Sequence, residues 1–234
     1  MNKHNNNDPT ALLVPDQKPP YAYYESAMAI KIHHFYLSQS IEDPEKYIEM
    51  IHRIKTSNPG EVIYIYLNTP GGRLDTAIQL INAMRVSQAK IITVIEAESH
   101  SAGTLIFLCG DEFIVHDNCS MMFHNFSGGT FGKGNEMKLQ IDATTRWFNK
   151  LAKDIYYPFL SHVEIDDMLT GKDIWMESEE IRKRLKKMVK ILTQDRKKKE
   201  KVTTVINVDT VDTIEGDEDL TTQPPKKKST KKGA

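Results

Sequence analysis

The sequence has few cysteines, no long apolar run and no excess of charge of either sign. Its two cysteines, Cys109 and Cys119, lie in or beside apolar segments and lack the spacing of a metal site or a disulfide framework, so we expect both to be reduced and structural. No apolar run approaches the ~18–20 residues of a membrane-spanning helix. Met1–Pro15 lacks the hydrophobic core of a secretory signal. By elimination, we expect a cytoplasmic protein that does not contact a membrane.

The balance of charge and the lack of ligand patterns exclude further classes. With 31 basic and 32 acidic residues the net charge is −1, which gives no general attraction to nucleic acid. Metal-ligand spacings and paired carboxylates are missing, and no glycine-rich segment ends in the Lys-Ser/Thr of a phosphate-binding loop. We therefore expect no metal and no cofactor.

Composition divides the chain into three parts. Residues 1–24 are Asn-rich and interrupted by proline, which is typical of a flexible arm. Residues 25–194 carry the periodic apolar patterns of one large domain. Residues 195–234 are rich in lysine and have few apolar residues, which predicts a disordered tail. We expect that tail to be solvated rather than bound to nucleic acid, because no aromatic residues lie among its lysines.

Apolar patterns typical of strands and helices alternate along the domain. Val62–Leu67 is a near-continuous run of β-formers, which predicts a strand buried on both faces of a parallel sheet, and Lys90–Glu96 is the next expected strand. The alternation predicts an α/β fold with right-handed crossovers. The other expected strands are Lys31–Leu37, Glu112–Val115 and Ser120–Phe123, and the expected helices are Glu42–Ile54, one from near Asp75, Asn135–Leu160, Asp166–Leu169 and Glu177–Leu192.

A β-branched strand pattern, Ile91–Ile95, is followed between Glu96 and Gly110 by a turn, a serine and an apolar helix. This order holds the Ser101 hydroxyl at a helix N-terminus, where backbone N–H groups and the helix dipole stabilise a developing negative charge. Ser101 is therefore a candidate nucleophile. A serine at this position is also a common N-cap, so a purely structural role is the alternative.

A serine hydrolase also needs a base, a group that orients the base, and two oxyanion donors. His124 follows a predicted strand and precedes a glycine-rich loop, at the edge where parallel sheets bind ligands. Asp173 precedes an apolar, aromatic segment, where a partly buried carboxylate would need a partner such as an imidazole N–H. The alternative for His124 is a purely structural imidazole, and the alternative for Asp173 is a carboxylate that caps a helix or a turn. An N–H in Pro70-Gly71-Gly72 is the expected second donor, unless that segment is an ordinary tight turn.

Together these motifs resemble the Clp protease proteolytic subunit family. They are Asn68–Gly72, then Ser101-Ala102-Gly103 with its apolar helix, then Met122–His124 followed by Gly128-Gly129. The resemblance covers roughly Ile32–Ile181. It implies a crotonase-like spiral of ββα units with mostly parallel sheets and a protruding handle helix, and it makes residues 25–194 the catalytic domain.

The resemblance also implies a role for each site residue. Ser101 would be the nucleophile, His124 the general base and then acid, and Asp173 the residue that orients the imidazole. The backbone N–H groups of Gly72 and Ala102 would form the oxyanion hole.

The family's substrate and assembly give further expectations. Gly71, Gly128 and Gly129 would bind an extended polypeptide substrate. Family members form stacked heptameric rings that enclose the active sites, and an AAA+ unfoldase feeds them. We therefore expect a homo-oligomeric ring that cleaves unfolded polypeptides.

The sequence departs from the family pattern in places. Ala102 stands where the family usually has Met, Glu98 adds a charge beside the nucleophile, and the interval from Ser101 to His124 is slightly short. The basic helix and tail replace the usual closing segment. Such divergence would suit a phage-type member. Two other functions stay open, a catalytically inactive structural or regulatory ring subunit and a crotonase-type acyl-CoA enzyme.

Overall fold

The computed structural model describes residues 30–209, and the side chains of residues 30–194. The predicted arm at 1–24 and the last part of the predicted tail, 210–234, lie outside the described residues. No helix in the part of the chain that the structure describes is long and apolar enough to cross a membrane.

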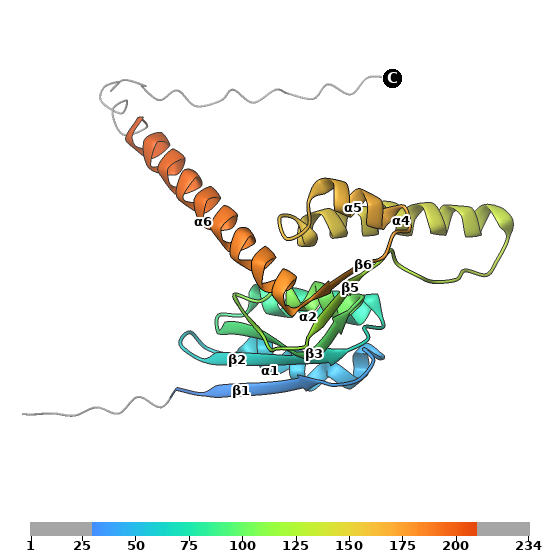
Figure 1. The fold of residues 1–234 in the computed structure, drawn as a ribbon, viewed down its shortest axis with the longest axis horizontal. Helices are drawn as coiled ribbons and strands as arrows, with labels where there is room; N and C mark the ends of the chain where they lie inside the picture. The colour runs from blue at the N-terminus through green and yellow to red at the C-terminus, as the bar shows by residue number, and fades with distance from the viewer. Residues whose placement is uncertain (1–29, 210–234) are drawn as a thin grey trace, which may run out of the picture.

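The described residues fold around one mostly parallel, six-stranded sheet (Figure 1). The strands pair in the order β1-β2-β3-β5-β6, and β4 also pairs with β3. Only β6 is antiparallel, to β5. The strands are β1 Ile32–Leu37, β2 Val62–Thr69, β3 Lys90–His100, β4 Glu112–Val115, β5 Ser120–Phe123 and β6 Ile174–Glu177. The predicted α/β class with a mostly parallel sheet is confirmed.

The long strand β3 pairs with two short strands in succession. Its first half, Ile92–Ile95, pairs with β4, and its last residues, Glu98–His100, pair with β5. The ends of β3 and β5 therefore lie side by side at the same edge of the sheet.

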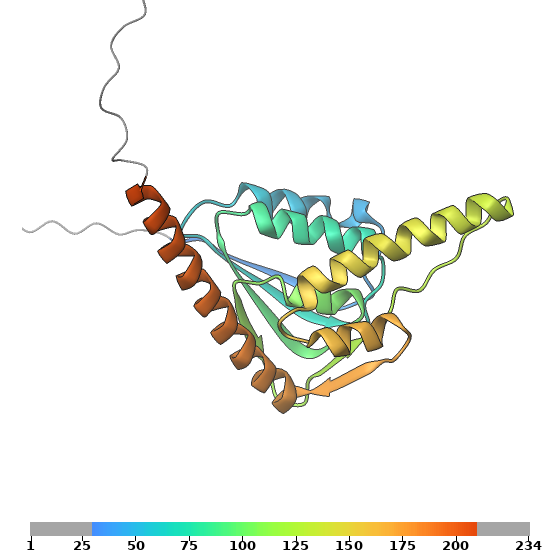
Figure 2. The same ribbon diagram turned by 90° about the horizontal axis from the view of Figure 1, so that it is seen from above.

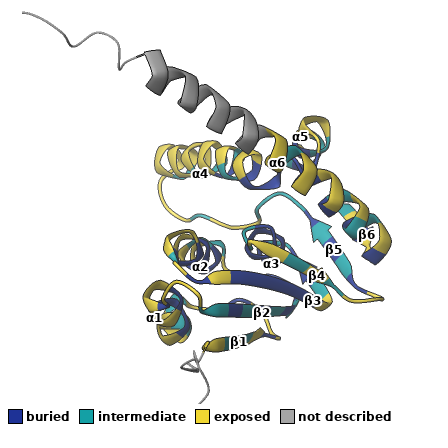
Figure 3. Ribbon diagram, turned by 90° about the vertical axis from the view of Figure 1, so that its left-hand side faces the viewer, coloured by how far each residue is buried: buried dark blue, intermediate teal, exposed yellow. Residues whose placement is uncertain are grey.

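Three of the helices form a layer on the sheet, and two others extend beyond it. α1, α2 and α3 lie on one face of the sheet (Figure 3), whereas α4 and α6 project away from the body (Figures 1 and 2). The helices are a 3-10 helix η1 Pro44–Tyr47, α1 Ile48–Thr56, α2 Leu74–Val86, α3 Ala102–Phe107, α4 Gly134–Tyr156, α5 His162–Leu169 and α6 Ser178–Asp209. The predicted start of the tail at residue 195 thus lies inside α6.

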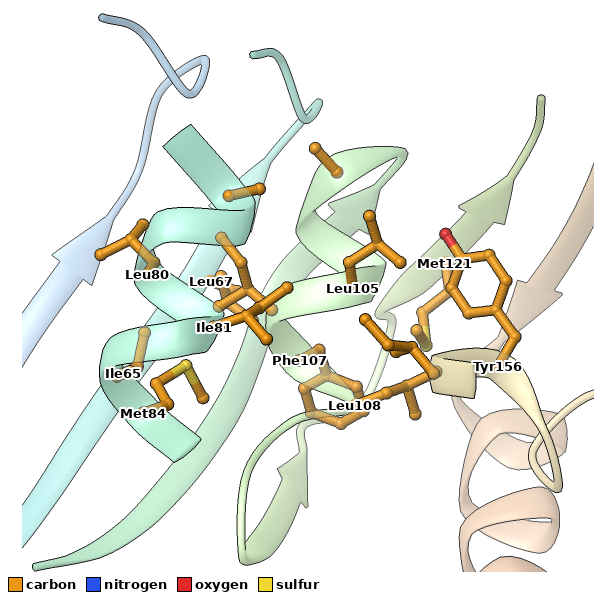
Figure 4. Close-up of a cluster of buried hydrophobic side chains, with 14 of the residues drawn as sticks. Ile65, Leu67, Leu80, Ile81, Met84, Leu105, Phe107, Leu108, Met121 and Tyr156 are labelled. Atoms are coloured by element: carbon orange, nitrogen blue, oxygen red, sulfur yellow. The ribbon is translucent and has the colours of Figure 1, made fainter. Parts of the chain in front are cut away.

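The core lies between the sheet and the helices α2 and α3 (Figure 4). Leu67 of β2, Leu80 and Ile81 of α2 and Leu105 of α3 are each at most 1% exposed. Full burial of one such aliphatic side chain contributes about 1.5–3 kcal/mol. This packing fixes α3, and with it the residue that precedes α3, against the sheet.

The expectation that the strand at Val62–Leu67 is buried on both faces is wrong. Along β2 only alternate residues are buried, and Tyr64 and Tyr66 on the other face are partly exposed. The helices cover one face of the sheet at β2, so its second face keeps tyrosines, whose ring is apolar and whose hydroxyl can remain in water. In β3, by contrast, every residue of Ile91–Ile95 is buried.

A bidentate ion pair connects the start of α6 to α5. Arg184 donates from Nη2 to Glu164 Oε1 at 2.7 Å and from Nη1 to Oε2 at 3.0 Å. The Arg184 guanidinium holds the pKa of Glu164 at about 2, well below its ordinary value. Glu164 also accepts the N–H of Ser161 as part of the capping box of α5. The ionised carboxylate therefore stabilises both helices.

We predict that Arg184→Met lowers the free energy of unfolding by about 1–2 kcal/mol at pH 7. The folded-state pKa of Glu164 is lowered, so this stabilisation is present above the ordinary carboxyl pKa of 4.5 and is lost as pH falls toward about 2. Urea unfolding at several pH values measures the gap between wild type and variant. The exposed Lys183→Met serves as the control, and a gap as large at pH 3 as at pH 7 would contradict the assignment.

Candidate active site

Ser101 and His124 meet at the edge where β3 and β5 end. Ser101 follows β3 directly, His124 follows β5 directly, and His124 Nε2 lies 2.6 Å from Ser101 Oγ. The Ser101 N–H donates to Met122 O at 2.8 Å, which extends the β3–β5 ladder by one bond beyond the end of β3. Two residues 23 positions apart in sequence are thus held within hydrogen-bond distance.

The Ser101 backbone adopts a conformation that non-glycine residues rarely have. Its φ is 52° and its ψ is −122°, at the sharp turn from β3 into α3. Ser101 occupies the N-cap position of α3, but its hydroxyl makes no capping hydrogen bond. The N-cap alternative therefore does not account for this side chain, whose hydroxyl is directed at an imidazole instead. Unusual backbone conformations of this kind concentrate at functional sites.

The Pro70-Gly71-Gly72 turn packs directly beneath Ser101. A Cβ at Gly71 would lie 2.6 Å from His100 O and 2.7 Å from Ser101 Cβ, and Gly71 has a φ of +94°. A Cβ at Gly72, whose φ is +144°, would likewise clash with the backbone of Ile41. The backbone of Ile41 forms hydrogen bonds to the residues on either side of Gly72. Only glycine fits at these two positions.

Two backbone N–H groups beside Ser101 remain available to a ligand. Ala102 is the first residue of α3, so its N–H has no acceptor within the helix. Among the described residues, no acceptor is found for the Gly72 N–H either. Gly72, Ala102 and Ser101 all line one cleft. Such donors can stabilise the negative charge that develops on a carbonyl oxygen when the Ser101 hydroxyl attacks its carbon.

This cleft has a volume of about 1150 Å³ and lies between α4 and the edge of the sheet where β3 and β5 end. The predicted substrate-binding residues Gly128 and Gly129 line it, and a Cβ on either would meet open space. Gly71 is not among its lining residues. Its N–H already donates to Thr69 Oγ1 at 3.1 Å, so Gly71 supports the turn at Ser101 rather than the cleft wall. The apolar side chains of the cleft are Ile41, Leu74, Leu105, Phe126, Met137, Ile141, Trp147 and Phe148.

Asp173 is exposed, and the expectation that it is partly buried is wrong. The neighbouring Trp175 is itself 63% exposed, so the apolar segment after Asp173 does not cover it. Within residues 30–194, the Asp173 carboxylate forms neither a hydrogen bond nor an ion pair. Phe123 pairs with Ile174 in the antiparallel β5–β6 ladder, so His124 and Asp173 are the next two residues beyond that pair. Asp173 is close in register to the imidazole but is not bonded to it.

The charge of Glu98 is directed away from Ser101. Glu98 Oε2 lies 3.4 Å from Nδ1 of His100, and His100 Nε2 lies 2.8 Å from Ser120 Oγ. The His100 ring also packs edge-on against Trp175, with centroids 5.2 Å apart. This network ties β3, β5 and β6 together on the sheet face opposite α3.

Two residues at the site have no signal in the sequence pattern. Thr104 in α3 and Tyr156 at the end of α4 bond to each other at 2.8 Å between Oγ1 and the phenol oxygen. Thr104 lies in an apolar run, and Tyr156 is 52 residues away, so only the tertiary fold brings them together. Cys109 is no rival nucleophile, since burial raises the pKa of its thiol to about 11.

Comparison with known proteins assigns the chain to a family. The Clp protease family model matches residues 21–180. The chain belongs to the Clp protease family. The ATP-dependent Clp protease proteolytic subunit of Streptococcus suis (strain 98HAH33) is 27% identical over 131 residues, which cover 54% of this chain and 67% of that relative. The resemblance inferred from the motifs is thereby confirmed, and membership of the Clp protease family supports a serine protease of this general type.

We predict that Gly71→Ala destabilises the protein by at least ~2 kcal/mol, because the new methyl group meets His100 O and Ser101 Cβ and the residue keeps a positive φ. Urea unfolding measures the loss. Gly129→Ala is the matched control, since its methyl group would meet open space, and it should change stability by less than ~0.5 kcal/mol. Equal stability of the two variants would show that the turn is not packed as described.

Proposed function

We propose that this Clp family member is a serine endopeptidase that cleaves unfolded polypeptides through an acyl-enzyme. The observation that carries the proposal is the 2.6 Å approach of His124 Nε2 to Ser101 Oγ, with Ser101 held at a positive φ. A hydroxyl that only caps a helix needs neither feature. An acyl-CoA enzyme of the crotonase type needs no serine–histidine pair, so this geometry does not favour it.

In the proposed reaction, Ser101 Oγ attacks the carbonyl carbon of the scissile peptide bond while His124 Nε2 takes the hydroxyl proton. The negative charge that develops on the carbonyl oxygen is held by the N–H groups of Gly72 and Ala102. His124 then gives its proton to the leaving amine, which departs and leaves an acyl-Ser101 ester. A water molecule, deprotonated by His124, hydrolyses this ester and restores Ser101.

We propose Asp173 as the residue that orients the His124 imidazole. Its position one step beyond the Phe123–Ile174 pair supports this role, since a rotation of its exposed side chain would bring the carboxylate toward Nδ1. Hydrogen bonds between catalytic groups are often long or absent without substrate. The missing bond also favours a second function, an inactive ring subunit in which the triad does not assemble.

The cleft beside Ser101 suits an extended polypeptide. Gly128 and Gly129 expose backbone that could pair with a peptide held as a strand, and the apolar cleft wall would accept apolar side chains. We assign this catalytic unit to residues 25–194, with the arm and tail outside it.

Exposed apolar side chains along α4 and the loop before it support assembly into a ring. Phe131, Leu139 and Ile141 are 102%, 67% and 52% exposed on the part of the molecule that projects from the body (Figures 1 and 3). A monomer rarely leaves such side chains uncovered together. We propose that α4 packs against other copies in stacked heptameric rings. The name of the Streptococcus relative includes ATP dependence, which supports an AAA+ unfoldase as partner.

We predict that Ser101→Ala abolishes both hydrolysis of a fluorogenic peptide and covalent labelling by a fluorophosphonate probe, because the probe reacts only with an activated serine. Intact mass after probe treatment reports the label, and native mass of the same sample reports the ring.

The wild-type protein must gain the mass of one probe per chain and Ser101→Ala none, with the native mass unchanged. Labelling that persists in Ser101→Ala would overturn the assignment of the nucleophile. A wild-type ring that is neither labelled nor active would favour the inactive subunit.

We predict that Asp173→Asn lowers kcat by about 10²–10⁴-fold with little change in KM, because an amide would favour the wrong imidazole tautomer. Steady-state peptide hydrolysis measures both constants. Asp167→Asn is the control, since the Asp167 carboxylate is paired with Lys172 rather than placed in register with His124. Wild-type kinetics in Asp173→Asn would exclude the orienting role.

A further inference from the structure

A buried pair of hydroxyl groups joins the end of α4 to the helix that follows Ser101. Tyr156 is 1% exposed and Thr104 is fully buried, and Tyr156 Oη lies 2.8 Å from Thr104 Oγ1. Figure 4 shows Tyr156 reaching from the end of α4 to the side of Leu105 and Met121. Neither hydroxyl belongs to the proposed triad or oxyanion hole.

The direction of the hydrogen bonds follows from the number of protons. Thr104 Oγ1 lies 2.6 Å from Ser101 O, an acceptor without a proton, so Thr104 must donate its single hydroxyl proton there. Thr104 Oγ1 then only accepts from Tyr156, whose O–H is the donor. The chain of donors runs from Tyr156 through Thr104 and ends on the carbonyl of Ser101.

That carbonyl is one of two anchors that hold the Ser101 backbone. On the other side, the Ser101 N–H donates to Met122 O. Ser101 O also accepts the Thr104 N–H at 3.0 Å. A residue at φ 52° stays there only when its surroundings hold it, so weakening one anchor allows the turn to relax. Such relaxation would move Oγ away from the imidazole.

Tyr156 also supports the strand that carries the histidine. Its ring packs edge-on against Phe123, the residue before His124, with centroids 5.1 Å apart and an interplanar angle of 84°. One side chain from α4 therefore touches the supports of both members of the Ser101–His124 pair.

We propose that Tyr156 and Thr104 are positioning residues for the Ser101–His124 pair. The inference rests on the proposed peptidase function and deepens it. Tyr156 borders the cleft but is almost fully buried, and its hydroxyl is bonded to Thr104. It acts through Thr104 on the nucleophile turn and through Phe123 on the base.

The test is a double-mutant cycle with a rescue variant. Tyr156→Phe keeps the ring on Phe123 and removes the donor, whereas Thr104→Val keeps the shape and removes both bonds of the hydroxyl. We expect each to lower kcat and the fluorophosphonate inactivation rate by about 10–100-fold with KM within about twofold, since small misplacements of a reacting group are costly. The double variant should be no slower than Thr104→Val, because both act through one chain. Thr104→Ser keeps the hydroxyl and should restore the rate.

Two controls separate positioning from general loss of stability. Tyr157→Phe changes the adjacent, 44% exposed tyrosine, and Thr56→Val removes the same type of hydroxyl-to-carbonyl bond in α1. Both should keep the wild-type rate. Lowered melting temperatures with unchanged kcat in Tyr156→Phe and Thr104→Val, or a Thr104→Ser variant as slow as Thr104→Val, would overturn the proposal.

A measurement without turnover keeps this result distinct from the proposed function. Amide hydrogen exchange of the peptide that spans Ser101–Thr104 should be faster in Tyr156→Phe and unchanged in Tyr157→Phe, in the full-length assembly. Unchanged exchange in Tyr156→Phe overturns the positioning role. A wild-type protein that Ser101-directed probes do not label, but whose exchange responds as expected, contradicts the peptidase and supports the positioning role.

Discussion

The bond from the Ser101 N–H to Met122 O is the constraint on which the site depends. It continues the parallel pairing of β3 and β5 past the end of β3, so the residue that leaves β3 is tied to the strand that leads to His124. From there the chain must turn into α3 at once, which forces Ser101 into its positive φ. The glycines at 71 and 72 make room for this arrangement, since a side chain at 71 would meet His100 O and Ser101 Cβ and one at 72 would meet the backbone of Ile41. The placement of Ser101 relative to His124 is therefore determined mainly by backbone hydrogen bonds rather than by side-chain contacts.

The fold could be predicted well where the signal is local. β4 and β5 have the predicted bounds, and β3 begins at the predicted Lys90. The prediction that β2 is buried on both faces failed, because apolar content does not say whether a helix covers the second face. β6 was not predicted as a strand, since four residues with one buried position carry little pattern. The end of α6 was also missed, because a lysine-rich segment has the composition of a tail whether or not it is helical.

At the candidate site, too, the residues with a local sequence signal could be predicted and those that depend on tertiary packing could not. Ser101, His124, Gly72 and Ala102 follow strand ends or turns, and parallel strands bring such positions together at one edge. The environment of Asp173 depends on how the loop before β6 is covered, and its sequence neighbours do not determine that. Thr104 and Tyr156 meet only because α4 returns to α3 across the core, a contact that no local pattern encodes.

The two tryptophans give the molecule separate optical reporters. Trp147 lies on α4 and lines the cleft, whereas Trp175 lies on β6 against the His100 ring on the other side of the sheet. An indole responds to the polarity of its surroundings. The emission of one indole therefore follows what enters the cleft and covers α4, and that of the other follows the packing of β6 against β3. With only these two in the sequence, replacing either by phenylalanine leaves a single fluorophore at a known place.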